Sequence, residues 1–416
     1  MTYLNAIKYL LSLPEKGDVP EDAALLERMR TVAAELDHPE RDTLYVHIAG
    51  QSGKNSCARM LKSVLTAAGY SVGHYALTQL SMDPKDIRTR VTIGQTLLPY
   101  DDLTNQIARL SATYARLFPD VFPLREEVLF LIALGYFKDR KCDVVLIERT
   151  GQRNDPAILT DPSSLMLFTP TKEDELPSLT GLLPRGVQEV VCAPQHRTVY
   201  DRISDACAEN GCRLTVPVYG ELTIDRIRIL KTVFTYRGIQ YALPCFSPCQ
   251  TVNAITVIEA AQALTRLGLS LSKEAILRGL SVVSLPLKCE ALSVEPTVLI
   301  ACVDSNEEMD TLCASLTQIK ETLGAALTVY ASEAMLSRQE RLTEMFAAYG
   351  LVIGDFIALD KDRVALARQI RQTIVSPRKQ GVLSVDAAPK PATLFLGDTP
   401  GMLSIFPLIQ KYLVRI

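Results

Sequence analysis

The stretch that decides the fold is His47-Ile48-Ala49-Gly50-Gln51-Ser52-Gly53-Lys54-Asn55-Ser56. The apolar residues that lead into it, 43–49, predict a buried strand. From Lys54 to Ala68 apolar side chains recur at helical spacing, and Gly69 follows as a residue that ends helices. A strand, a glycine turn and a helix in this order are typical of proteins with a parallel sheet covered by helices.

The turn itself has the composition of a phosphate-binding site. Gly50 and Gly53 let the backbone approach an anion closely, and the first N–H groups of the following helix point toward that anion. Lys54 adds a mobile cation, and the Ser56 hydroxyl can bind Mg²⁺ or a phosphate oxygen. The spacing is not that of the usual Walker motif, because two residues separate the glycines and Asn55 follows the lysine. A plain strand-to-helix turn with a surface lysine is the alternative.

Around the turn, the rest of the chain predicts two α/β domains. Strands and helices alternate as far as residue 192, which favours a mainly parallel sheet with helices on both faces. A hairpin around Arg237-Gly238 follows, and a second, smaller strand–helix alternation begins at Thr297. We therefore expect an ATP-binding domain at 1–285, a linker at 286–296 and a Rossmann-like α/β domain at 297–416.

The bulk composition narrows the class of protein. The chain has 416 residues and a formal net charge of -3, with no block of Lys and Arg, so we expect no nucleic-acid binding. The longest apolar run, 128–137, is about half the length of a membrane span, and the N-terminus lacks signal-peptide features. The ten cysteines form no Cys-x-x-Cys pair, which favours reduced thiols over zinc or disulfides. These features predict a cytoplasmic protein that does not bind membranes.

The turn and several other landmarks resemble the folylpolyglutamate synthase/dihydrofolate synthase family of the Mur ligase superfamily. That family carries His-Val-Ala-Gly-Thr-Asn-Gly-Lys-Gly-Ser where this chain has residues 47–56. Further matches follow in the family's order along nearly the whole chain: Leu26-Glu27-Arg28, Glu127, Val145-Leu146-Ile147-Glu148 with Arg153 and Asp155, Phe234-Thr235-Tyr236-Arg237-Gly238 with Gln250 and Asn253-Ala254, and Pro286, Lys288 and Glu290. The resemblance implies a Mur ligase-like N-terminal domain followed by the smaller domain of that superfamily.

The resemblance also implies a reaction and a set of site residues. Family members use ATP and Mg²⁺ to phosphorylate a carboxylate of a folate or pteroate substrate, and the amino group of glutamate then forms an amide. Carried over by position, the nucleotide-binding residues are Gly50, Gly53, Lys54, Asn55, Ser56, Arg153, Asp155 and Asn253, and the metal-binding residues are Ser56 and Glu148. For two of them a structural role is the alternative: Glu148 as a helix cap and Asn253 as the N-cap of a helix at 253–267.

This sequence departs from the family pattern mainly at the second metal site. No histidine follows the strand at 165–168, where the family has Asp-His, and Glu173 or Asp174 is a hypothetical replacement. Four further family segments are altered: Ser-Pro-His-Leu is Leu77-Thr78-Gln79-Leu80, Lys-Ala-Gly-Ile is Leu179-Thr180-Gly181-Leu182, the His of Gly-x-His-Gln is Cys249, and Asp-Gly-Ala-His-Asn is Cys302-Val303-Asp304-Ser305-Asn306.

These losses leave two hypotheses of different class. The first is an ATP-dependent ligase of folate biosynthesis and one-carbon metabolism that joins an acid to an amino acid. The second is a catalytically degenerate relative that binds nucleotide or acts as a scaffold. A generic P-loop NTPase or kinase is disfavoured by the Lys-Asn-Ser spacing and by the second α/β domain. In both hypotheses we expect a monomer with small-molecule ligands, and the residues assign no catalytic group.

Overall fold

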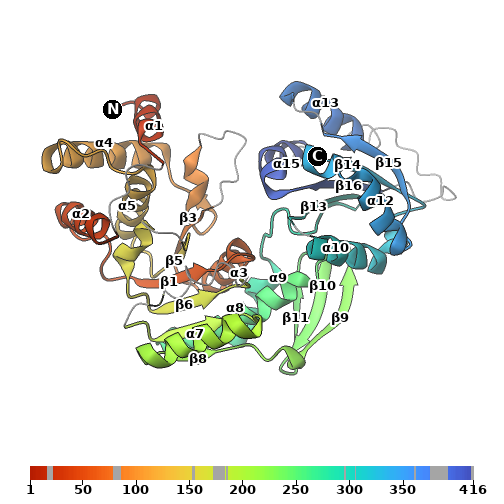
Figure 1. The fold of residues 1–416 in the computed structure, drawn as a ribbon, viewed down its shortest axis with the longest axis horizontal. Coiled ribbons are helices and arrows are strands. Elements are labelled where there is room, and N and C mark those ends of the chain that lie inside the picture. The colour runs from red at the N-terminus through yellow and green to blue at the C-terminus, as the bar shows by residue number, and fades with distance from the viewer. Residues whose placement is uncertain are drawn as a thin grey trace. The chain divides into compact units, whose positions relative to one another are not determined.

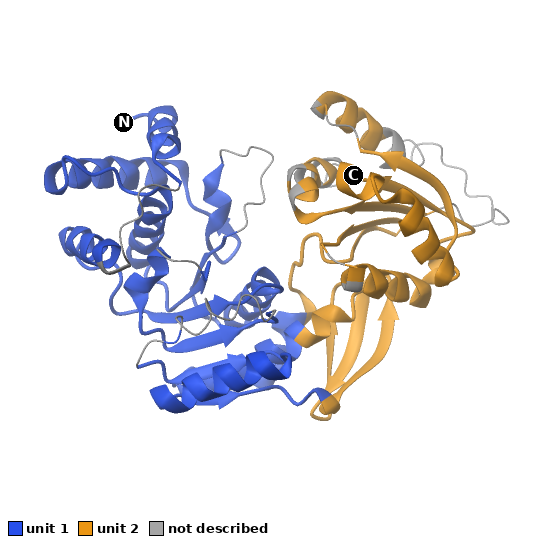
Figure 2. Cartoon of the chain, viewed as in Figure 1, with its two compact units in different colours: residues 1–79, 85–219, 253–280 blue, residues 80–84, 220–252, 281–416 orange. Residues whose placement is uncertain are grey.

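The computed structural model describes residues 1–416 except 16–21, 78–85, 152–154, 172–182, 184–185, 295–296, 305, 360–361, 375–391 and 414–416. The chain divides into two compact units that interleave along the sequence (Figure 2). Unit 1 comprises residues 1–79, 85–219 and 253–280, and unit 2 comprises residues 80–84, 220–252 and 281–416. The domain bounds expected at 1–285 and 297–416 follow the chain order instead and remain a prediction.

Unit 1 is built on an eight-stranded, mainly parallel sheet in the order β4-β3-β2-β5-β1-β6-β7-β8 (Figure 1). Only β3 and β4, at one edge, run antiparallel to their neighbours. The strands are β1 Leu44–Ala49, β2 Val72–Tyr75, β3 Val91–Ile93, β4 Thr96–Leu97, β5 Val144–Glu148, β6 Leu165–Phe168, β7 Glu189–Cys192 and β8 Arg213–Thr215. The predicted parallel sheet is therefore confirmed.

Helices cover both faces of this sheet, also as predicted. Along β1, Tyr45 faces the cluster formed by α1, α2, α4 and α5, and the alternate residues Val46 and Ile48 face the opposite side, where α3 lies. The helices are α1 Tyr3–Ser12, α2 Asp22–Glu35, α3 Lys54–Ala67, α4 Tyr100–Leu117, α5 Arg125–Asp139, α7 Arg197–Asn210, α8 Cys249–Arg266 and α9 Lys273–Ser281, with short 3₁₀ turns η1 Ile87–Arg90 and η2 Pro156–Thr160.

Two of the landmarks that carried the resemblance meet inside unit 1. Arg28 on α2 donates Nε to Glu127 Oε1 at 2.8 Å and Nη2 to Oε2 at 2.6 Å. The Tyr114 hydroxyl donates to the same carboxylate at 2.6 Å, and the Leu124 N–H donates at 3.2 Å. Because Glu127 is buried and accepts four hydrogen bonds, this pair locks α2 and α4 onto α5.

Unit 2 contains a three-stranded antiparallel sheet and a five-stranded sheet in the order β12-β13-β16-β14-β15. The predicted hairpin is present, with Arg237 and Gly238 at φ 49° and 70° between β10 and β11, as a type I′ turn requires. Its other elements are β9 Leu222–Arg228, β10 Lys231–Tyr236, β11 Ile239–Leu243, β12 Glu290–Ser293, β13 Val298–Cys302, α10 Asn306–Gln318, β14 Leu327–Ala331, α11 Glu333–Leu336, α12 Gln339–Ala348, β15 Ile353–Ala358, α13 Arg363–Ile374, β16 Ala392–Gly397, α15 Thr399–Leu413, and the 3₁₀ turns η4 Tyr219–Glu221 and η5 Lys320–Thr322.

Two further properties concern the residues that the structure describes. The ten cysteines are free thiols, and all of them except Cys249 are buried or half-buried. Within the part of the chain that the structure describes, no helix has the length and apolarity needed to cross a membrane.

Candidate functional site

The glycine turn between β1 and α3 is tightly enclosed by protein groups. Gly50 and Gly53 have φ of +126° and +91°, and Gly53 is the N-cap of α3. A Cβ at Gly50 would lie 2.4 Å from Thr169 Oγ1 and 2.6 Å from its carbonyl oxygen. A Cβ at Gly53 would lie 2.7 Å from Asn253 Oδ1. Both positions therefore require glycine for conformation and for space.

The polar groups of the turn are partly engaged inside the protein. The N–H groups of Gln51 and Ser52 donate to the Pro170 carbonyl at 3.2 and 3.1 Å, and Lys54 Nζ donates to the Gly50 carbonyl. The first amides of α3 have no acceptor within the helix, and the buried Ser56 side chain lies in its first turn. The start of α3 thus offers the N–H groups and the hydroxyl that a phosphate group would need.

Asn253 is brought to the turn from α8, far along the chain. Its side-chain oxygen lies closest to the position that a Gly53 Cβ would take, and Cys57 Sγ approaches the same oxygen at 3.7 Å. The alternative that Asn253 is an N-cap is wrong, because α8 already begins at Cys249 and places Asn253 in its second turn. Pro248, directly before the helix, is the signal that could have shown this earlier start.

Glu148 lies buried at the end of β5, on the face of the sheet that α3 covers. Its Oε1 accepts from Asn55 Nδ2 and from His74 Nε2, both at 3.0 Å, and its Oε2 accepts from the Leu77 N–H at 3.1 Å. Burial alone raises the pKa of Glu148, but the hydrogen bonds from His74, Leu77 and Asn55 outweigh it and hold the pKa below its usual value. Glu148 does not cap a helix, because the following turn η2 is capped by Asp155.

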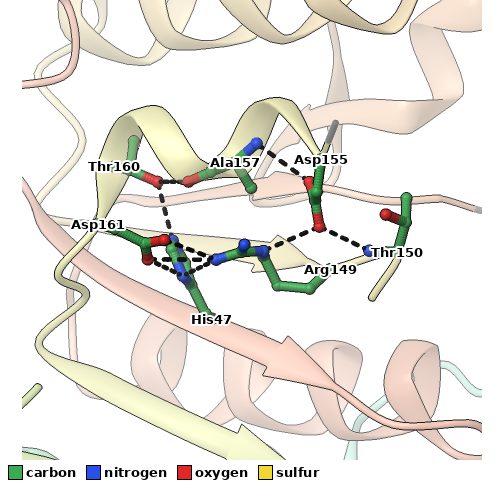
Figure 3. A network of polar contacts seen from close by, with 7 residues as sticks. All are labelled: His47, Arg149, Thr150, Asp155, Ala157, Thr160 and Asp161. Atoms are coloured by element: carbon green, nitrogen blue, oxygen red, sulfur yellow. Dashed lines mark hydrogen bonds and ion pairs between the residues drawn. The ribbon is translucent and has the colours of Figure 1, made fainter. Parts of the chain in front are cut away.

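Asp155, predicted beside the nucleotide, belongs to a buried network on the other face of the sheet (Figure 3). Its Oδ2 accepts from Arg149 Nε at 2.9 Å and from the Thr150 N–H at 3.0 Å, and its Oδ1 accepts from the Ala157 N–H at 3.1 Å. The Arg149 guanidinium also donates to Asp161, at 3.2 and 3.3 Å. Through these three bonds the Asp155 carboxylate fixes the segment after β5.

His47, quoted only as part of the motif, is the centre of that network. Thr160 Oγ1 donates to the Ala157 carbonyl at 2.8 Å and lies 2.8 Å from His47 Nε2, so Nε2 carries the hydrogen. The Nδ1 atom lies 2.9 Å from Arg149 Nη1 and 3.2 Å from Asp161 Oδ1, and burial lowers the pKa of His47. His47 was missed as a structural residue because its partners lie about a hundred positions away.

Ser56 and Glu148, the two residues predicted to bind Mg²⁺, both lie near the start of α3. Ser56 and Glu148 supply a hydroxyl and a carboxylate near the start of α3, which suits an Mg²⁺ ion that also binds phosphate oxygens and water. Among the described residues, no group of three or more His, Cys, Asp or Glu side chains could hold a metal by itself. Arg153, Glu173, Asp174 and 179–182 lie outside the described residues.

Comparison with known proteins gives one consistent set of relatives, although no family model matches the chain. Folylpolyglutamate synthase of Lacticaseibacillus casei is 24% identical over 384 residues, which cover 85% of each chain. Dihydrofolate synthase/folylpolyglutamate synthase of Bacillus subtilis is 22% identical over 325 residues, covering 70% of this chain and 72% of that protein.

Solved structures with a similar fold carry the same protein names as the sequence relatives. The apo form of the L. casei folylpolyglutamate synthase superposes with a TM-score of 0.79 at 19% identity, covering 99% of this chain and 100% of that one. A folylpolyglutamate synthase complex with AMPPCP and folate superposes with a TM-score of 0.74 at 19% identity, covering 99% of each chain.

The mainly parallel sheet with the glycine turn after its interior strand β1, and the second α/β unit, make up a fold that this chain shares with the solved folylpolyglutamate synthases. In sequence, the chain is similar over most of its length to proteins named folylpolyglutamate synthase and dihydrofolate synthase/folylpolyglutamate synthase.

Proposed function

We propose that the protein is an ATP-dependent ligase that joins an amino acid, in the first instance glutamate, to a carboxylate of a folate-like acceptor. The observation that carries this proposal is the turn at residues 50–56, where two glycines that tolerate no Cβ precede a helix with a lysine and a buried serine in its first turn. The sequence relatives are named as ligases of this kind, and one structural neighbour contains both a nucleotide analogue and folate.

The proposed reaction has two steps whose atoms balance. A carboxylate oxygen of the acceptor attacks the γ-phosphorus of ATP, so that an acyl phosphate forms and ADP leaves. The amine nitrogen then attacks the acyl carbon, the C–O bond to phosphate breaks, and an amide, inorganic phosphate and a proton are released. Water hydrolyses an acyl phosphate readily but hydrolyses an amide only slowly. A site that excludes water therefore protects the acyl phosphate until the amine attacks it.

Each residue of the turn has a separate task in this proposal. Lys54 and the amides at the start of α3 bind the β- and γ-phosphates, and the helix dipole adds to their attraction. Ser56 offers its hydroxyl to the Mg²⁺ ion that accompanies the nucleotide, which neutralises phosphate charge when bound. Asn253 reaches the turn from α8 beside Gly53, and in this proposal it contacts the nucleotide.

The test is a coupled measurement of phosphate release. The protein is incubated with ATP, Mg²⁺, folyl or pteroyl acceptors and glutamate, and each component is omitted in turn. We expect release only when acceptor and amine are both present. Lys54→Ala should abolish it, whereas Lys8→Ala, an exposed lysine on α1, should not. Release that is independent of the amine would contradict a ligase and indicate an ATPase.

A second candidate function rests on the occupied polar groups of the site. Two amides of the turn already bind the Pro170 carbonyl, and both oxygens of Glu148 already accept hydrogen bonds from the protein. These contacts favour a degenerate relative that binds nucleotide without turnover. A thermal shift with ATP, combined with the phosphate assay, separates the two candidates. ATP should stabilise both, but the degenerate relative should release no phosphate with any acceptor and amine.

A further inference from the structure

The surroundings of Glu148 suggest how this chain handles the divalent cation, an inference that rests on the proposed function. The carboxylate is 2% exposed and lies between β2, β5 and the start of α3. It accepts three hydrogen bonds at 3.0, 3.0 and 3.1 Å, which are ordinary lengths for N–H donors. The two donors on Oε1 belong to the side chains of Asn55 and His74.

The orientation of the Asn55 amide is fixed by a second contact. Arg59, one helical turn later, donates Nε to Asn55 Oδ1 at 2.8 Å. An arginine can only donate, so the amide oxygen must face Arg59 and the amide nitrogen must face Glu148. Asn55 therefore cannot present its oxygen to a cation without giving up both contacts. The family resemblance has glycine at this position, so the side chain that occupies Glu148 Oε1 is a feature of this chain.

The same reasoning applies to His74 on β2. Its Nε2 lies 3.0 Å from Glu148 Oε1, and a nitrogen at that distance from a carboxylate oxygen must carry a hydrogen. With Asn55 on the same oxygen, both accepting positions of Oε1 are used. The Leu77 N–H takes one of the two positions on Oε2. A cation that binds Oε1 directly must come within about 2.0–2.1 Å of it, where the two donors would have to be displaced. A cation that binds the remaining position on Oε2 would have to reach a carboxylate that is only 2% exposed.

We propose that Asn55 and His74 keep Glu148 out of the inner coordination sphere of the nucleotide's Mg²⁺, and that Glu148 acts on the ion only through water or as an anchor between β5, β2 and α3. The ion is then held by phosphate oxygens, by the Ser56 hydroxyl and by water, a ligand set that Mg²⁺ accepts readily. Asn55 is a positioning residue in this account, because it acts through the carboxylate that it binds.

The first experiment measures ATP affinity by calorimetry with Mg²⁺ and with a chelator. The quantity compared is the ratio of the affinity with Mg²⁺ to the affinity with the chelator. We expect Glu148→Gln to leave this ratio unchanged and Ser56→Ala to lower it. In an Asn55→Ala background the freed carboxylate should raise the ratio about tenfold, and Glu148→Gln should then remove the gain. A fall in the ratio of about tenfold or more in Glu148→Gln alone would overturn the proposal.

The second experiment uses Mn²⁺ alone, without nucleotide, and follows the free ion by electron paramagnetic resonance. We expect the native chain and Glu148→Gln to bind Mn²⁺ equally weakly, and Asn55→Ala to bind it more tightly. Tight binding by the native chain that Glu148→Gln abolishes would refute the proposal even if ATP does not bind. Failure of ATP to bind in the first experiment would instead refute the proposed function. Alanine keeps α3 intact because it is the strongest helix former.

Discussion

Replacing Gly53 by alanine perturbs the phosphate turn in a way whose size the structure allows us to separate into two parts. The backbone strain of a side chain at φ +91° costs about 1–3 kcal/mol. The new Cβ would also lie 2.7 Å from Asn253 Oδ1, and moving that buried amide adds a further ~1–3 kcal/mol, the usual cost of overpacking. The free energy of unfolding should therefore fall by about 2–6 kcal/mol, the sum of the two costs.

Gly69→Ala is the matched control, since Gly69 has φ +95° and no atom lies within 4 Å of its Cβ position. It incurs the backbone strain alone. Urea unfolding of both variants, with ATP affinity by calorimetry, checks the difference. We expect Gly53→Ala to be the less stable variant and to lose ATP affinity, while Gly69→Ala keeps it. Equal stability and equal affinity of the two variants would refute the idea that Gly53 is required for space.

Three further predictions concern features outside the turn. Glu127→Gln should lower the free energy of unfolding by ~3–5 kcal/mol in urea, because it leaves the Arg28 guanidinium facing a neutral amide inside the protein; a loss below ~1 kcal/mol would mean that the pair behaves like a surface pair. Burial raises the pKa of Glu126, but the bonds from Arg90 outweigh it and hold the pKa below its usual 4.5. Its pairing therefore stabilises the protein above pH 4.5 and is lost as the pH falls below that value, so the melting temperature of Glu126→Gln should depend less on pH there than that of the native chain. Arg237→Asn should raise the free energy of unfolding by ~0.5 kcal/mol or less, and the melting temperature slightly with it, because asparagine tolerates the left-handed conformation at φ 49°; a lower melting temperature would mean that the contacts of the Arg237 side chain outweigh its backbone strain.

Local patterns were enough to predict most of the fold. The strand at β1, the glycine turn and α3 follow from apolar periodicity and glycine placement over some 25 residues, and the structure has them at nearly the predicted positions. The short hairpin of β3 and β4 was not predicted, because strands of three and two residues carry too few side chains to show a period.

The contacts of the site residues could not be predicted in the same way. Glu148 and Arg149 are neighbours in sequence, yet strand alternation sends one side chain to α3 and the other to η2. Their partners lie between 6 and 102 positions away, a separation that periodicity does not encode. The resemblance named Glu148 and Asp155 together as site residues, but only the tertiary structure shows that Glu148 bonds to α3 and β2 while Asp155 bonds to Arg149 and to the start of η2.

The central claim is that ATP activates a carboxylate of the acceptor before the amine attacks. The most direct measurement uses an acceptor whose reacting carboxylate is labelled with ¹⁸O, and follows phosphate by mass spectrometry during turnover with ATP and glutamate. Because the acyl phosphate keeps the carboxylate oxygen as its bridging atom, the account predicts one ¹⁸O in each phosphate released together with amide product. Phosphate released with product but without ¹⁸O would contradict the account.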